Sequence, residues 1–311
     1  MRLDDAASLH RFELACSELD GATGLRTQAD WQRKLTDEAH TAENSVIAID
    51  ENSHIAAAGR IDYSLRAEEV HAFLDGRVHP DHRGQGIGTA LLGWLEARGH
   101  EHLASIADGR QQVLRILFYD RAADAVDLFE RHGFRHQYAE DEMRHDLREP
   151  IPERPLPGGM TFHTWTPENA SDYFKVYEDA FRTRTGSRLS KPAWHDHFAN
   201  EEDEEFHPEL SLLARDKDEP VAYAVCHVDV VDDGATVDEA WITQMGVRPA
   251  WRRRGIASAL LAESMRRFAA SGYTYAMLSV NVNNPEARRL YEQMGFRSTK
   301  RLNVYRKEIE P

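Results

Sequence analysis

The sequence has little cysteine and no long apolar segment. Cys16 and Cys226 are the only cysteines among 311 residues, and they lack the spacing of metal ligands. A disulfide framework is therefore excluded, and we expect a reducing cytoplasm and no metal. No apolar run approaches the roughly 20 residues that cross a bilayer, so we expect no membrane partner. The start, MRLDDAASLHRFEL, lacks the basic region and apolar core of a signal peptide.

Positive charge is also scarce. The chain has 38 Lys and Arg against 53 Asp and Glu, a net charge of −15. Such a surface repels a phosphate backbone, so nucleic acid is not an expected partner, whereas a cationic amine is tolerated. The hydrophobic and charged fractions, 41% and 29%, are those of a globular protein, and the length fits two domains of about 150 residues each.

The chain contains one pattern twice. VHPDHRGQGIGTALL, beginning at Val78, matches VRPAWRRRGIASALL, beginning at Val247, without a gap. DAVDLFERHGF, ending at Phe134, then matches EARRLYEQMGF, ending at Phe296. Two matches in the same order predict a duplicated domain. The proline- and glycine-containing segment 148–159 predicts a linker between domains 1–147 and 160–311, with a loop inside one domain as the alternative.

Periodicity predicts an α/β (α+β) fold in each copy. In the second copy we expect strands at 160–165, 210–214, 220–230, 237–247 and 275–280, two closing strands around Ser298, and helices at 167–184, 254–271 and 285–294. In the first copy we expect a helix at 6–19 with no strand before it, and strands at 44–50, 54–63 and 69–78.

Each copy has a loop with small residues between a strand and a helix, Arg83 to Gly88 and Arg252 to Ala257. The N-terminus of a helix offers unpaired N–H groups and partial positive charge, which favour a phosphate. An NTPase loop would need Gly-Lys-Ser/Thr, and a dinucleotide fingerprint starting at Gly84 would need glycine in place of Thr89. Both of those are excluded, and a simple strand-to-helix turn remains the alternative.

The two blocks, Val-x-Pro-x-x-Arg-x-x-Gly-x-Gly/Ala and Asn-x-x-Ala-x-x-Leu-Tyr-x-x-x-Gly-Phe, resemble the GCN5-related N-acetyltransferase (GNAT) family. In this chain the second block reads Asn284, Ala287, Leu290, Tyr291, Gly295 and Phe296. The resemblance covers the cofactor half of each copy. It implies two tandem GNAT domains, each a mixed, mostly antiparallel sheet whose central parallel pair of strands splays apart to take acetyl-CoA.

The resemblance also implies cofactor-binding residues. In the second copy these are Met245, Val247, Arg252, Arg253, Arg254, Gly255, Ala257, Ser258 and Asn284. In the first copy they are Val78, Arg83, Gly84, Gly86, Gly88 and Thr89. The amides of 253–258 would hold the pyrophosphate, and the backbone of Met245 and Val247 would pair with the pantetheine arm like an added strand.

Acetyl transfer to an amine needs a proton acceptor, an oxyanion site and a proton donor for the departing thiolate. Tyr291 matches the family's donor. The first copy has Phe129 there, and Ala122 in place of Asn284, so we interpret it as non-catalytic. Many family members place a glutamate at the position of Trp241; here Glu239, two residues earlier on the same strand face, is the candidate base, and a solvated carboxylate is the equal alternative.

The predicted function is an acetyl-CoA-dependent N-acetyltransferase that acts, as monomer or homodimer, on a primary amine of a small molecule. The tandem layout also resembles mycothiol synthase-type acetyltransferases. A non-catalytic acetyl-CoA sensor is the alternative from another class. Arg182, Arg184 and Arg188 are either contacts for an anionic substrate group or an exposed helix end.

Overall fold

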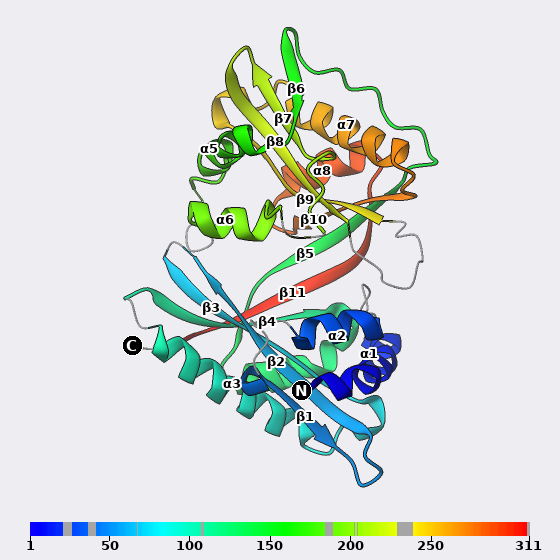
Figure 1. Ribbon diagram of the computed structural model, residues 1–311, viewed down its shortest axis with the longest axis vertical. Helices are drawn as coiled ribbons and strands as arrows, with labels where there is room; N and C mark the ends of the chain where they lie inside the picture. Colours follow the sequence, from blue (N-terminus) through cyan, green and yellow to red (C-terminus); the bar gives the residue numbers. More distant parts are fainter. Residues whose placement is uncertain are drawn as a thin grey trace. The chain divides into compact units, whose positions relative to one another are not determined.

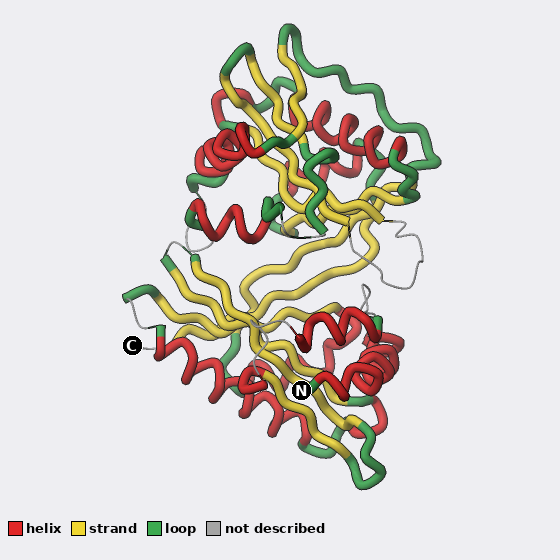
Figure 2. The backbone as a smooth tube through the Cα atoms, in the orientation of Figure 1, coloured by secondary structure: helices red, strands yellow, loops and turns green. Residues whose placement is uncertain are grey.

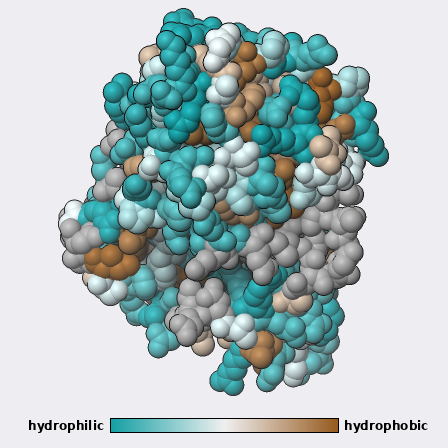
Figure 3. All heavy atoms as spheres, turned by 45° about the horizontal axis from the view of Figure 1, so that its top comes forward, coloured by the Kyte–Doolittle hydropathy of each residue, from teal (hydrophilic) through white to brown (hydrophobic). Residues whose placement is uncertain are grey.

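The chain forms two compact units. The computed structural model describes residues 1–20, 27–36, 42–66, 68–106, 109–183, 189–201, 203, 205–228 and 239–309. The described part of unit 1 consists of the described residues of Met1–Ala139 and of Arg301–Pro311. Unit 2 consists of the remaining described residues, from Glu140 to Lys300. On the face shown in Figure 3, hydrophilic residues predominate, as the charge composition suggests.

Unit 1 is a sheet between helices. Its elements are α1 (Ala6–Asp20), α2 (Gln28–Thr36), β1 (Ser45–Ile49), β2 (Ile55–Leu65), β3 (Glu69–Val78), α3 (Ile87–Ser105), β4 (Gln111–Tyr119) and α4 (Val126–Arg131). Neighbouring strands are antiparallel except for the parallel pair β3–β4. One face packs on α3 through Leu92, Leu95 and Leu103, and α1 and α2 contribute a separate apolar cluster.

Unit 2 repeats this plan. Its elements are β6 (Met160–Thr164), α5 (Ala170–Ala180), α6 (Lys191–Phe198), β7 (Leu212–Asp216), β8 (Glu219–Val228), β9 (Glu239–Val247), α7 (Ile256–Ala270), β10 (Tyr275–Asn281) and α8 (Pro285–Gln293). Among the described strands of this unit, β9 and β10 run parallel and the other neighbouring pairs are antiparallel. The predicted inward residues of α7, Leu260, Leu261, Met265 and Phe268, are fully buried on one sheet face, whereas α5 and α6 cover the other.

The last strand of each repeat completes the sheet of the other unit. Residues 140–146 of β5 (Arg135–Asp146) pair with β10 of unit 2. Residues 302–309 of β11 (Arg297–Ile309) pair with β4 of unit 1, and Figure 1 shows both long strands. The predicted domain boundaries at 147 and 160 divide the chain in sequence order. In the structure, each half of the chain instead provides the closing strand of the unit that the other half mainly forms.

Most predicted elements lie within a few residues of the observed ones. The prediction of two closing strands around Ser298 is wrong, because β11 is continuous from Arg297 and has no turn-forming glycine or proline. The short helices α2 and α6 were not predicted. The predicted linker contains no helix or strand (Figure 2), and its Ile151 and Leu156 pack against the core of unit 2.

Candidate active site

The parallel strands of unit 2 separate partway along their length. Their paired residues begin at Glu239 and Tyr275 and end at Trp241 and Met277, although β9 continues to Val247 and β10 to Asn281. Among the described residues of unit 1, the pairing of β3 with β4 ends in the same way, after Phe73 and Arg115. Each unit therefore has the splayed central pair that the sequence pattern implied.

The open part of β9 presents peptide groups to this gap. The Arg248 N–H donates to Val221 O on β8, at 2.9 Å. Because successive peptide groups of a strand point in opposite directions, those of Val247 and Met245 face away from β8 and toward the open side. The geometry therefore suits both residues to the strand-like pairing expected of them.

The loop after β9 exposes a row of main-chain N–H groups. Arg253 and Gly255 have positive φ, 58° and 84°, a pattern that turns successive N–H groups to one side. The first bond of α7 at the loop runs from Ala259 N–H to Gly255 O, at 3.0 Å. The N–H groups of Ile256, Ala257 and Ser258 precede it, so this helix end offers donors and partial positive charge to an anion.

The arginines of the loop differ in what they contact. Arg252 donates from Nε to Val247 O at 3.1 Å and from Nη2 to Ala180 O at 2.7 Å. Arg254 donates to Ala250 O at 3.0 Å. All three arginines are exposed, and the side chains of Arg252 and Arg254 fasten the loop to its own scaffold.

In unit 1 the corresponding loop is anchored by a carboxylate. Arg83 donates to Val78 O at 3.1 Å and makes a two-pronged ion pair with Asp20, at 2.8 and 2.9 Å. Gly84 and Gly86 have positive φ, and Gly88 and Thr89 lie in the first turn of α3. The loop keeps its shape, but Asp20 brings a negative charge beside it.

A bulge interrupts β9 just beyond the point of separation. The register against β8 shifts between Val225 and Cys226, so Thr243 is an extra residue on β9. The bulge places two consecutive side chains on the face of α5 and α6. Thr243 Oγ1 lies 2.7 Å from His227 Nδ1, and Gln244 accepts hydrogen bonds from Trp194 and Tyr223.

Unit 1 has no equivalent bulge in its described strands. Residues 57–65 of β2 pair with residues 70–78 of β3 in an unbroken register. Thr243 therefore has no counterpart on β3, and Leu74 corresponds to Ile242: Leu74 packs beneath α3 as Ile242 packs beneath α7. The two units therefore differ in the strand that borders the gap, and the sequence alone did not reveal this difference.

Two positions are candidates for proton transfer, and they lie at different distances from the point at which β9 and β10 separate. Glu239 is the first residue of β9, half-buried beside Tyr275, two residues before the pairing ends. Trp241 is the last paired residue, and His227 lies directly opposite it on β8. No motif singled out His227; the only signal is a polar residue in the otherwise apolar run of β8.

Tyr291 and Asn284 both belong to α8. Asn284 is the N-cap, and its side chain accepts from Ala287 N–H at 3.2 Å. As the N-cap, Asn284 stabilises the start of α8, which has nine residues. In unit 1 the equivalent residue is Ala122, upstream of α4, which has six residues. Tyr291 is half-buried, with its ring centroid 6.2 Å from that of Phe296.

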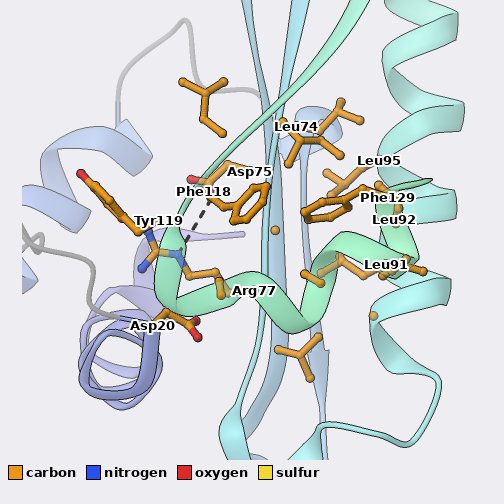
Figure 4. Close-up of a pocket in the computed structure, with 18 of the residues that line it drawn as sticks. Asp20, Leu74, Asp75, Arg77, Leu91, Leu92, Leu95, Phe118, Tyr119 and Phe129 are labelled. Carbon is orange, nitrogen blue, oxygen red and sulfur yellow. Dashed lines mark ion pairs between the residues drawn. The ribbon is translucent and has the colours of Figure 1, made fainter. Parts of the chain in front are cut away.

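Unit 1 shows where these two positions lie relative to the gap. A cavity of about 300 Å³ opens between the separated ends of β3 and β4. Ala122 and Phe129, the counterparts of Asn284 and Tyr291, both line it. Figure 4 shows Phe118, Phe129 and Leu95 around this apolar space. By the repeat, residues 284 and 291 are expected at the same wall in unit 2.

The remaining observations concern the arginines after α5, metal ligands and membrane-spanning helices. Arg182 is exposed, and Arg184 and Arg188 lie outside the described residues. No group of three or more His, Cys, Asp or Glu side chains in the described ranges is arranged to hold a metal ion. Within the same ranges, no helix is long and apolar enough to span a membrane.

Comparison with known sequences gives two domain matches. A family model described as acetyltransferase (GNAT) family matches residues 172–296, and one described as acetyltransferase (GNAT) domain matches residues 42–136. A mycothiol acetyltransferase of Clavibacter michiganensis is 31% identical over 248 residues, which cover 78% of this chain and 72% of the relative. Another, from Nocardiopsis dassonvillei, is 26% identical over 250 residues, covering 70% and 69%.

Solved structures agree on the fold. A GCN5-related N-acetyltransferase from Sphaerobacter thermophilus has a TM-score of 0.82 at 27% identity, covering 100% of this chain and 95% of that one. A tandem GNAT protein from the clavulanic acid biosynthesis pathway has a TM-score of 0.68 at 14% identity, covering 100% and 98%. The second likeness concerns the fold alone.

Proposed function

The chain belongs to the GNAT acetyltransferase family as a tandem member, and from this premise we propose that unit 2 transfers the acetyl group of acetyl-CoA to a primary amine of a small molecule. One observation carries the proposal: β9 and β10 separate beside the bare N-terminus of α7. That arrangement offers a strand edge to the pantetheine arm and N–H donors to the pyrophosphate.

Each part of the loop has a role in this proposal. The N–H groups of 253–258 hold the pyrophosphate, and the exposed Arg253 adds a full positive charge. Arg252 and Arg254 act indirectly, because their guanidinium groups keep the loop in place. The peptide groups of Met245 and Val247 align the thioester along β9.

The chemistry follows from the groups around the gap. Main-chain N–H groups of β9 beyond Trp241 stabilise the oxyanion that forms when the amine attacks. Tyr291 donates its phenolic proton to the departing thiolate. Asn284 begins the helix that carries Tyr291 and so fixes where the hydroxyl lies.

We assign unit 1 a non-catalytic role. Its cavity is of a size to take part of a coenzyme A molecule, but Phe129 has no hydroxyl and the bordering strand has no bulge. A binding module is the second candidate function, and Phe129 favours it for this unit. Val78, Arg83, Gly84, Gly86, Gly88 and Thr89 are then ligand contacts without a reaction.

The acceptor can be identified directly. The relatives named mycothiol acetyltransferase make the cysteinyl-glucosaminyl-inositol amine the first compound to test. Thiol release from acetyl-CoA would be measured with that amine, spermidine, an aminoglycoside and free amino acids, each against a reaction without amine. We expect amine-dependent thiol release and a product heavier by one acetyl group. Binding of acetyl-CoA without turnover of any amine would favour the sensor function instead.

A further inference from the structure

We propose that His227, on β8, accepts the proton that the attacking amine loses in unit 2. This inference rests on the proposed function, because it names the base of that same reaction. The location of His227 supports this role: His227 pairs with Trp241, the last residue of β9 that still pairs with β10. The imidazole therefore lies one strand away from the point at which the gap opens.

The face of the sheet is the one from which an amine would approach. The pyrophosphate loop leads into α7, and α7 covers the face formed by Ala222, Ala224 and Ile242. An amine must reach the thioester carbon from the opposite face. That face carries Tyr223 and Val225 of β8, and Thr243 of the bulge, to which His227 is hydrogen-bonded.

The contact with Thr243 orients the ring. His227 Nδ1 lies 2.7 Å from Thr243 Oγ1. We assign the tautomer in which Nδ1–H donates to this hydroxyl, which leaves the lone pair of Nε2 to accept a proton. The ring is largely enclosed, 9% exposed, with its centroid 5.6 Å from that of Phe206. The bulge that reshapes β9 thus also supplies the partner that fixes the imidazole.

The surroundings keep the imidazole neutral. Burial lowers the pKa of His227, Asp203 opposes this, and His197 and His207 add smaller lowering contributions, which together bring the pKa to about 4. A neutral ring is able to accept a proton at every pH above about 5. The amine's proton then passes to Nε2 after the nitrogen has bonded to the carbonyl carbon.

The acetyl transfer balances in protons and electrons with His227, Tyr291 and the two substrates. The nitrogen lone pair forms the C–N bond while the carbonyl electrons move to oxygen, and Nε2 takes one N–H proton. As the oxyanion collapses, the C–S bond breaks and the thiolate takes the proton of Tyr291. The imidazolium returns its proton to solvent and the phenolate regains one, leaving the amide and free coenzyme A.

Unit 1 lacks both members of this pair. The counterpart of Trp241 is Phe73, at which the pairing of β3 with β4 ends, and the residue of β2 opposite Phe73 is Asp62. Thr243, as the extra residue of the bulge, has no counterpart on β3. Within the described strands, this histidine and threonine therefore belong to unit 2, which also has the tyrosine hydroxyl.

Glu239 is the competing base, so variants of both residues are needed. In the full chain, His227→Gln, Glu239→Gln and the control His163→Gln, an exposed histidine of β6, would be assayed with the amine of the above panel that gives turnover. We expect His227→Gln to lower kcat about 100-fold or more, with the KM for acetyl-CoA unchanged. We also expect it to remove the decline of kcat below about pH 5, and expect added imidazole to restore part of the activity of His227→Ala.

Several results would overturn the assignment. A folded His227→Gln variant with at least a third of the wild-type kcat would do so, and so would loss of activity only in Glu239→Gln. Should His227→Gln fail to fold, Thr243→Val keeps the volume and removes the partner of Nδ1. It is expected to lower kcat about tenfold, and an unchanged kcat and pH profile would count against the pair. A wild-type chain that binds acetyl-CoA but acetylates no amine refutes the proposed function itself.

Discussion

Arg253 of unit 2 and Gly84 of unit 1 hold the same place in their loops, and both have left-handed backbone, with φ of 58° and 73°. Glycine adopts this conformation without cost, whereas a residue with a Cβ pays roughly 1 kcal/mol. Unit 2 retains an arginine there despite that cost. Unit 2 thus carries a charged side chain in this loop in place of a relaxed turn.

Replacing Arg253 with glycine should separate stability from binding. We expect Arg253→Gly to raise the free energy of unfolding by up to about 1 kcal/mol and to weaken acetyl-CoA binding about tenfold. Lys217, with φ of 56° in the turn before β8, is the matched control. Lys217→Gly should give the same gain in urea unfolding with no change in calorimetric affinity. Equal affinities for the two variants would contradict the phosphate role of Arg253.

Tyr291→Phe removes the hydroxyl that distinguishes Tyr291 from its counterpart in unit 1, Phe129. The phenylalanine keeps the packing against Phe296, so we expect acetyl-CoA affinity to persist while kcat falls about 100-fold, because the thiolate loses its proton donor. Steady-state kinetics would measure both, with Tyr273→Phe, at the far end of α7, as the control. If kcat were unchanged, Tyr291 would be only a packing residue.

The sequence predicted the parts of the fold that are local. The repeat located the loop before α7, the buried face of that helix and the helix that carries Tyr291. Asn284 followed by proline is also a readable helix start, although its capping role was not predicted. Residues close in sequence determine these features, so periodicity and turn chemistry are sufficient to find them.

The features that were missed depend on pairing between distant segments. The pattern of Arg297–Ile309 indicates a strand, but β4 and β10 are similar edges, and nothing local states which one it joins. The bulge at Thr243 adds one residue to a strand and leaves no motif. His227 gains its meaning only when β8 lies against β9, so its proximity to the gap was not predictable from spacing.

The exchanged strand gives a stability prediction. Deleting residues 301–311 should uncover the edge of β4, because residues 302–309 supply its pairing. Amide exchange in Gln111–Tyr119 should become faster, whereas exchange in Tyr275–Asn281, which pairs with β5, should change little. A synthetic 300–311 peptide should restore the protection of β4. Unchanged exchange in β4 would mean that β11 does not close this sheet in solution.

Unit 1 should lose stability in mild acid through His71. Burial and Arg115 lower the pKa of this fully buried imidazole to about 4, from an ordinary value near 6.5. Between these values the unfolded chain takes up a proton that the folded unit does not, so stability is complete above pH 6.5 and declines as the pH falls toward 4. The decline attributable to His71 amounts to about 3 kcal/mol at most.

Urea unfolding at pH 7 and pH 5 would test this in the full chain. His71→Asn should reduce the difference between the two pH values, and His54→Asn, an exposed histidine whose side chain is 80% exposed, should leave it as in the wild type. An identical pH difference in all three proteins would rule out His71 as the source.

Acetyl-CoA binding in unit 2 requires that the start of α7 holds the diphosphate, and a matched pair of substitutions tests this most directly. Ser258→Asp and Thr89→Asp each place a carboxylate in the first turn of a helix, which favours the helix but repels a phosphate. Calorimetric titration of acetyl-CoA and the amine-dependent thiol release would be measured for both full-length variants. We predict that Ser258→Asp loses at least tenfold in the affinity of the catalytic site, about 1.4 kcal/mol, together with its turnover, whereas Thr89→Asp keeps its turnover. Full affinity and turnover in Ser258→Asp would contradict the account.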